Sequence, residues 1–190
     1  MDNFSYEKER ALNRTDHSQK GRVDEHIIPL LDAINTHPDY YTTSSCAGRI
    51  LLIASPENPK KHQHHWLIVE HNTANTHQFS QALHSAKDPQ VFLAMQAAIV
   101  HVACRTIHDA QRLLDTIRWK RSGIIRIEPY ALVQLIASEH LHIPLRIRGE
   151  TIITNTQLAQ MLAHANELLA RTHTRIVEAE ERIGSFLGAS

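Results

Sequence analysis

The run from Asp39 to Ile53 constrains the fold most, because it sets a polar segment between two segments that favour β-strands. Tyr40 to Thr43 carries the aromatic and β-branched side chains that suit a pleated, half-buried surface. Ile50 to Ile53 is a continuous apolar run, typical of a strand that is buried on both faces. The segment between them, Ser44 to Arg49, combines two hydroxyls, a thiol, a glycine and a guanidinium. Two interpretations stay open: a tight turn with locally satisfied serines, or a site that binds an anion or a polar cofactor edge.

Helical periodicity is strongest near the C-terminus. Apolar residues three and four positions apart continue from Thr156 to Leu187 and predict one long helix with a single apolar stripe. Similar spacing predicts a helix from Val23 to Thr36, which Pro29 is expected to kink or shorten, and another from Ile107 to Ile117. Weaker patterns predict helices at residues 2–14 and 76–85.

The remaining apolar runs predict strands at residues 66–70, 91–95, 99–104, 124–128, 131–138 and 142–148. Residues 91–104 could also form one long bent strand, residues 140–142 are expected to turn, and Pro144 indicates an edge strand or a bulge. Strands interrupted by occasional helices favour an α+β fold, with helices packed on a mixed or antiparallel sheet as a two-layer sandwich. No Gly-x-Gly-x-x-Gly follows a predicted strand, so a Rossmann-type cofactor site is not supported.

Length and composition indicate one domain over residues 1–190, with a hydrophobic fraction of 42% to supply its core. No apolar run approaches the roughly 20 residues that cross a bilayer, and the charged N-terminus lacks a signal region. We therefore expect a soluble, cytoplasmic protein. Cys46 and Cys104 lie far apart and are expected to be reduced thiols, with no zinc pattern. A formal net charge of zero argues against a broadly basic nucleic-acid surface, but a local patch remains possible.

Several side chains have both a structural and a functional interpretation. Cys46 could be a nucleophile, but a packed small side chain is the commoner role. The loop with Lys60, Lys61, His62, His64 and His65 is better explained as a solvated or RNA-facing loop than as a metal site.

His71 and His101 lie at or within predicted strands, where a satisfied, partly buried histidine is the ordinary finding. Arg118-Trp119-Lys120-Arg121 could contact phosphates and stack on a base, or it could be the basic end of a helix.

The segment from Thr43 to Ile50, Thr-Ser-Ser-Cys-Ala-Gly-Arg-Ile, resembles the signature of the wybutosine-synthesising methyltransferase family, the third enzyme of the pathway that builds tricyclic wyosine bases at position 37 of tRNA-Phe. Matching segments occur in the family's order before the signature, at residues 18–24, 34–35 and 39–43, and after it, at residues 66–71, 99–102, 122–124, 141–145, 166 and 175–176. The chain departs from the pattern at Ala47, at Gln96-Ala97, where the family tends to have Glu-Pro, and just before Ser122.

This resemblance implies S-adenosylmethionine-dependent methylation at N4 of 4-demethylwyosine, or of its aminocarboxypropyl derivative, in the anticodon arm of tRNA-Phe. Alignment of donor and acceptor would supply much of the catalysis. The expected catalytic residues are Ser44, Ser45, Arg49, Asp24 and His71. The expected cofactor-binding residues are Gly48, His101, Ser122 and Gly123, and His101 is an alternative to His71 as a proton relay. The expected RNA contacts are Lys20, Lys60, Lys61 and Arg121, which would make binding salt-dependent.

Two other functions remain open at this point. The Ser44–Arg49 segment could hold phosphate in an RNA-binding module without catalysis. Cys46 with His71 or His101 could instead form a thiol-dependent hydrolase.

Overall fold

The computed structural model describes residues 2–13, 23–57 and 63–187. Contacts between residues group the chain into two compact units. Unit 1 comprises Met1–Ala47, Ala98–Ser138 and Thr172–Ser190, and unit 2 comprises Gly48–Ala97 and Glu139–Arg171. Every strand pair in both units is antiparallel among the described residues, so the α+β prediction is confirmed. That residues 1–190 form a single domain stays a prediction.

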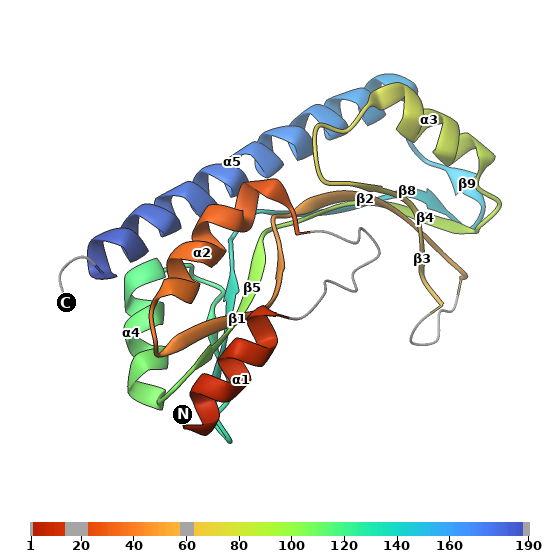
Figure 1. The fold of residues 1–190 in the computed structure, drawn as a ribbon. Coiled ribbons are helices and arrows are strands. Elements are labelled where there is room, and N and C mark those ends of the chain that lie inside the picture. The colour runs from red at the N-terminus through yellow and green to blue at the C-terminus, as the bar shows by residue number, and fades with distance from the viewer. Residues whose placement is uncertain (1, 14–22, 58–62, 188–190) are drawn as a thin grey trace. The chain divides into compact units, whose positions relative to one another are not determined.

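Unit 1 is built on a four-stranded sheet with the order β1-β5-β7-β6 (Figure 1). Its strands are β1 (Tyr40–Cys46), β5 (Ile99–Cys104), β7 (Ala131–Ile136) and β6 (Gly123–Arg126). Its helical segments are α1 (Asn3–Leu12), the 3-10 turn η1 (Glu25–Ile27), α2 (Ile28–Thr36), α4 (Ile107–Ile117) and the second half of α5 (Asn155–Leu187).

Alternation along β1 and β5 sends successive side chains of unit 1 to opposite faces of the sheet. On one face, the Tyr40 hydroxyl donates to the Asp109 carbonyl of α4 at 3.1 Å, and the side chain of Asn35, in α2, bonds to Thr42. On the other face, Phe4 of α1 packs against Tyr41, with ring centroids 5.1 Å apart. Helix α1 therefore covers part of the second face.

The predicted helix at Val23–Thr36 begins later than expected. Pro29 lies in the first turn of α2, where its missing N–H removes no intrahelical hydrogen bond, and η1 precedes it. Val23 is exposed and lies outside the helix. The proline thus fixes where the helix starts and does not kink it.

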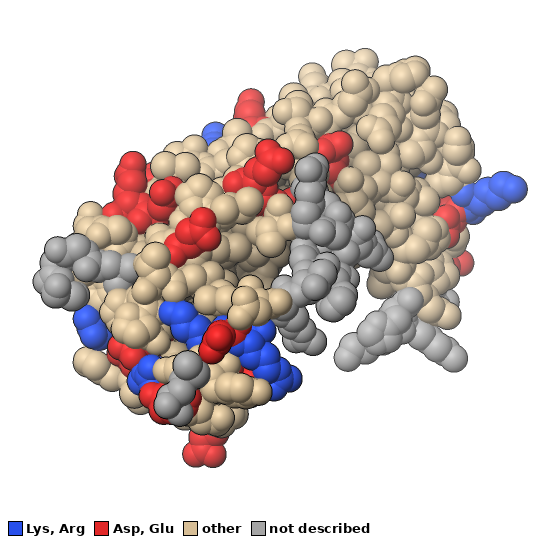
Figure 2. All heavy atoms as spheres, viewed as in Figure 1, with Lys and Arg blue, Asp and Glu red and all other residues tan. Residues whose placement is uncertain are grey.

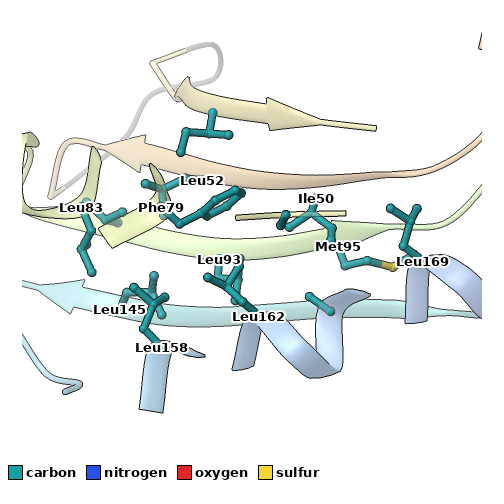
Figure 3. Packing of buried hydrophobic residues seen from close by; sticks show 14 of the residues in the cluster. Ile50, Leu52, Phe79, Leu83, Leu93, Met95, Leu145, Leu158, Leu162 and Leu169 are labelled. Atoms are coloured by element: carbon teal, nitrogen blue, oxygen red, sulfur yellow. The ribbon is translucent and has the colours of Figure 1, made fainter. Parts of the chain in front are cut away.

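Unit 2 contains a five-stranded sheet with the order β3-β2-β4-β8-β9. The strands are β2 (Arg49–Ser55), β3 (His65–Glu70), β4 (Gln90–Gln96), β8 (His140–Ile147) and β9 (Glu150–Thr151). Helix α3 (Thr76–Ser85) and the first half of α5 cover one face. Figure 3 shows Phe79 and Leu83 of α3 and Leu158 and Leu162 of α5 packed on Leu93, which is in β4.

The opposite face of this sheet, called the open face below, carries Arg49, Ile53, Trp66, Phe92, Gln96 and His142, together with the buried Leu51 and Ala94. A bulge in β3 places the Trp66 side chain on this face. Leu52 pairs with Ile68 but Ile53 pairs with Trp66, so the extra residue turns Trp66 to the side of Ile53. A second bulge in β8, between Pro144 and Arg146, confirms the prediction that Pro144 marks an irregular strand.

Three strand predictions need correction. Ser44, Ser45 and Cys46 continue β1, so only Ala47 and Gly48 form the connection to β2. Residues 91–104 are not one bent strand, because β4 and β5 belong to different sheets. Residues 140–142 lie within β8 and do not turn. The described segments include no helix with the length and hydropathy needed to cross a membrane.

Candidate functional site

A β-bulge at Thr43 decides where the Ser44 side chain points. Thr42 pairs with Val102, but Ser44 pairs with His101, so β1 carries one extra residue at this position. The extra residue moves Ser44 to the face of the sheet that His101 occupies. Ser45 pairs with Val100 and faces the other side. The two adjacent serine side chains therefore point to opposite faces of the unit 1 sheet.

Ser44, His101 and Gln134 form a hydrogen-bonded row across β1, β5 and β7. Ser44 Oγ lies 2.7 Å from His101 Nδ1, and Gln134 Nε2 lies 2.9 Å from His101 Nε2. With the amide nitrogen donating, the imidazole Nε2 accepts, so Nδ1 carries the proton and donates to Ser44 Oγ. If the Gln134 amide is rotated, its oxygen accepts from Nε2–H, and Nδ1 can then accept the Ser44 proton. Gln134 thus controls the tautomer of His101.

Burial lowers the pKa of the His101 imidazole below its ordinary value of 6.5. The ring is half-buried between two neutral partners, so the charged form loses hydration without gaining a counter-charge from either of them. His101 is therefore neutral near pH 7. A neutral imidazole with an exposed serine beside it can accept or relay a proton.

Gly123 extends this row to β6, because it pairs with Gln134 on the other side of β7. A Cβ placed on Gly123 would meet no atom within 4 Å, so the space above it is open. The neighbouring Ser122 hydroxyl accepts from the Ile136 N–H at 3.0 Å. Ser122 thus holds the end of β7 in place, and Gly123 leaves room for a ligand edge.

Asp24 is buried at 8% exposure and lies just before η1. Its carboxylate Oδ2 accepts from the Ala47 N–H at 3.2 Å, directly after the end of β1. The carboxylate therefore helps to fix the end of the strand that carries Ser44 and Ser45. A catalytic role for Asp24 stays a prediction.

Gly48, Arg49 and His71 lie in unit 2. Gly48 has a φ of 103°, which explains the glycine by backbone conformation alone. Arg49 Nε donates to Gln96 Oε1 at 2.8 Å, and its Cζ lies 4.5 Å from the centre of the Trp66 ring. His71 is half-buried directly after β3. The contacts of Arg49 place its guanidinium on the open face.

The structure divides the predicted RNA contacts. Lys20, Lys60 and Lys61 lie outside the described residues, as does His62. Arg121 is exposed in the turn before β6. Trp119 is only 6% exposed and cannot stack on a base, which corrects the stacking part of that interpretation. Phosphate contacts by the basic residues around it stay a prediction. Arg118 is the C-terminal cap of α4 in the left-handed conformation, and the last turn of the helix itself holds no basic residue.

Cys46, the last residue of β1, is half-buried and pairs with Ile99 of β5. Neither cysteine is in a disulfide, and burial with the nearby Asp109 charge raises the pKa of Cys104 to about 12. Both ring nitrogens of His101 are already engaged by Ser44 and Gln134. His101 is therefore not placed as a base for a Cys46 nucleophile.

Sequence reasoning missed Gln134. The available signal was a lone polar residue within the apolar strand Ala-Leu-Val-Gln-Leu-Ile. Alternation puts Val133 and Leu135 into the core and leaves Gln134 on the opposite face. In the sequence, Gln96 stands out only as a departure from the family pattern. The structure adds that its side-chain oxygen accepts a hydrogen bond from Arg49 Nε.

Charge on the face shown in Figure 2 is mixed. Lys and Arg gather near α1, whereas Asp and Glu lie over α2 and the C-terminal half of α5, all within unit 1. This view shows no continuous basic surface among the described residues, in agreement with a net charge of zero.

Comparison with known proteins covers almost the whole chain. The sequence profile of the family described as "Methyltransferase TYW3" matches residues 6–185. A Pyrococcus abyssi protein named tRNA(Phe) 7-((3-amino-3-carboxypropyl)-4-demethylwyosine(37)-N(4))-methyltransferase 1 is 32% identical over 187 residues, which cover 96% of each chain. A Mus musculus protein named tRNA wybutosine-synthesizing protein 3 homolog is 32% identical over 191 residues, covering 96% of this chain and 71% of that protein. The solved structure of the PH1069 protein from Pyrococcus horikoshii matches with a TM-score of 0.84 at 29% identity, covering 95% of this chain and 96% of that chain.

Proposed function

Because this chain belongs to the methyltransferase TYW3 family, we propose that it transfers a methyl group from S-adenosylmethionine to N4 of 7-(3-amino-3-carboxypropyl)-4-demethylwyosine at position 37 of tRNA-Phe. The chain is a tRNA methyltransferase of the wybutosine pathway. The similarity to a relative of that name along 96% of both chains carries this conclusion. A cytoplasmic location and recognition of the anticodon arm belong to the proposal.

The row of Ser44, His101 and Gln134 is our candidate for the proton-handling part of the site. A ring nitrogen that gains a methyl group must lose its proton. Ser44 is exposed, and its hydroxyl oxygen can accept a hydrogen bond from that N–H. Neutral His101 can then accept the serine proton at Nδ1. This requires that the Gln134 amide oxygen accepts from the Nε2–H of His101. In this scheme Gln134 is a positioning residue.

The residues around Gly123 fit an adenosine-type methyl donor in two respects. The space above Gly123 is open, and the Ser44 hydroxyl and the Gln134 amide offer hydrogen bonds along the same row. Gly123 would leave room for an edge of the donor, with Ser122 fixing the strand end beside it. When bound, S-adenosylmethionine supplies an electrophilic methyl group, and catalysis then depends on how the chain aligns donor and acceptor.

The decisive experiment uses methyl-labelled S-adenosylmethionine and tRNA-Phe taken from cells that lack this methylation step. We expect label in the modified base at position 37, and none in tRNA-Phe whose base is unmodified guanosine. RNA binding without any label in the base would favour the non-catalytic RNA-binding module. Ester hydrolysis that is lost on alkylation of Cys46 would favour the thiol hydrolase, for which the contacts of His101 offer no support.

A further inference from the structure

We propose that the open face of unit 2 is a stacking platform for single-stranded bases of the tRNA substrate, with Trp66 and the Phe92–His142 pair as its two stacking positions. This inference rests on the proposed function, because the occupant is a segment of the same RNA. It assigns a binding role to a surface of unit 2, whereas the row of Ser44, His101 and Gln134 belongs to unit 1.

The first stacking position is Trp66. Its side chain is 44% exposed although it is large and apolar, and the bulge in β3 turns it onto the open face. The Arg49 guanidinium lies 4.5 Å from the ring centre and is held by Gln96 at 2.8 Å. The guanidinium lies over one face of the indole, so the other face of the ring can stack on a base while the positive charge stays close by.

The second stacking position lies across the same face. Phe92 of β4 pairs with Ile53, which in turn pairs with Trp66. The two aromatic side chains therefore lie on the same row of paired residues across the sheet, two strands apart. The Phe92 ring stacks on His142 of β8, with centroids 4.9 Å apart and planes inclined by 17°. His142 is exposed, so its outer surface is available to a further planar group.

The charges of this face select an anionic occupant. Arg49, His140 and His142 lie on it, and none of the described positions of β2, β3, β4 and β8 that face this side is Asp or Glu. The carboxylate on this side is Glu150 of the edge strand β9, which pairs with Ile147 at the opposite edge of the sheet from Trp66. Helices α3 and α5 bury the other face of the sheet. Planar rings and the Arg49 guanidinium at Trp66, with the carboxylate of Glu150 at the opposite edge of the sheet, favour an anionic polymer with exposed bases over an acidic or apolar protein segment.

Three substitutions test the platform. Trp66→Ala removes the π-face, Trp66→Phe keeps an aromatic ring, and Tyr6→Ala removes an exposed aromatic from α1 of unit 1 as the matched control. The probe is a fluorescein-labelled hairpin with the tRNA-Phe anticodon stem and loop. We expect Trp66→Ala to weaken hairpin binding by roughly 10- to 100-fold, the range expected for loss of one stacked base. Trp66→Phe and Tyr6→Ala should bind within about 3-fold of the unchanged protein.

Tryptophan fluorescence gives a second readout that does not depend on affinity. The other tryptophan, Trp119, is buried, so quenching by the hairpin should come from Trp66 and vanish in Trp66→Phe while binding remains. Equal hairpin affinity in Trp66→Ala and Tyr6→Ala would overturn the platform. So would quenching of Trp66 by S-adenosylmethionine or adenosine but not by the hairpin.

The same proteins separate this inference from the proposed function. Methyl transfer by the unchanged protein, together with full hairpin affinity in Trp66→Ala, would leave the function standing and remove the platform. Hairpin binding that depends on Trp66, without methyl transfer to the demethylated tRNA, would leave the platform standing and remove the function. We expect the circular dichroism spectrum of each variant to match that of the unchanged protein, because both substituted side chains are exposed.

Discussion

Ser44 and Ser45 show how one residue decides chemistry. They are adjacent and chemically identical, yet the bulge at Thr43 places Ser44 beside His101 and turns Ser45 to the other face. The sequence predicted both serines and His101 as site residues, but a period of two cannot reveal a bulge. The partner that orients His101, Gln134, was not predicted because a lone glutamine in a strand has many ordinary explanations.

We predict that Ser44→Ala lowers kcat for methyl transfer by about 100-fold, since proton-handling groups contribute at least that much. The exposed side chain is not part of the core, so the midpoint of urea unfolding should not change. Ser45→Ala is the matched comparison and should lose less activity. A greater loss in Ser45→Ala than in Ser44→Ala would remove the row of Ser44, His101 and Gln134 from the site.

His101 also makes stability depend on pH. Its pKa is lowered in the folded chain, so the unfolded chain binds this proton first as the pH falls. The folded state is therefore favoured above the ordinary pKa of 6.5 and loses this advantage as the pH falls from 6.5 through the lower pKa of folded His101.

We expect His101→Gln to show a smaller loss of unfolding free energy than the unchanged protein between about pH 7.5 and about pH 5. Urea titrations at both pH values give the difference. His173, whose pKa is also lowered by burial and by nearby His26, remains in both proteins and cancels in the comparison. An identical pH dependence in the two proteins would contradict the prediction.

Among the elements, α5 connects local sequence to tertiary structure most directly. Its apolar stripe predicted the start of the helix to within one residue. The stripe did not predict which other elements the polar side chains of the helix contact. Asn166 accepts from the Ala74 N–H at 2.8 Å and donates to the Ala74 carbonyl at 3.2 Å. It thereby ties the loop that follows β3, and that contains His71, to the helix.

Asn166→Ala should destabilise the protein by about 1–3 kcal/mol, because the buried N–H and C=O of Ala74 lose their partner. Alanine is a better helix former than asparagine, so a loss of stability cannot come from helix propensity. Gln160→Ala, at an exposed position of the same helix, is the control and should be neutral or slightly stabilising. Equal unfolding midpoints for the two variants would show that the Ala74 contacts contribute nothing.

Short helices with clear end signals were predicted best. The bounds 76–85 and 107–117 are confirmed, because Asn75 caps α3 and Thr106 with Asp109 forms a capping box at α4. Strand bounds were less accurate, since a strand ends where its partner ends. Cys46 and His140 belong to strands only because Ile99 and Gln96 pair with them.

For the whole molecule, net charge links pH to RNA binding. The formal charge is zero with histidine neutral, and the chain holds 15 histidines. The sequence has a pI of about 7.3, so the chain gains net positive charge as the pH falls below that value. Phosphate neutralisation is the main sequence-independent source of affinity for nucleic acid.

We therefore predict that affinity for the tRNA-Phe hairpin rises several-fold between about pH 7.5 and about pH 6 at constant ionic strength. Fluorescence anisotropy at low salt measures this rise, and added salt should reduce it. Circular dichroism at the lower pH confirms that the fold persists. An affinity that is flat across this range would mean that histidines contribute little to RNA binding.

The sequence by itself determined the α+β class, the positions of the helices and the family, because periodicity, capping residues and ordered motifs are local properties of the chain. Only the tertiary structure decided that the strands form two sheets and that bulges turn Ser44, Trp66 and Arg146 to their present faces. It also decided that Trp119 is buried while Trp66 is exposed. The physical reason is that strand pairing joins residues far apart in sequence, and a shift of one residue in that pairing reverses every side chain beyond it.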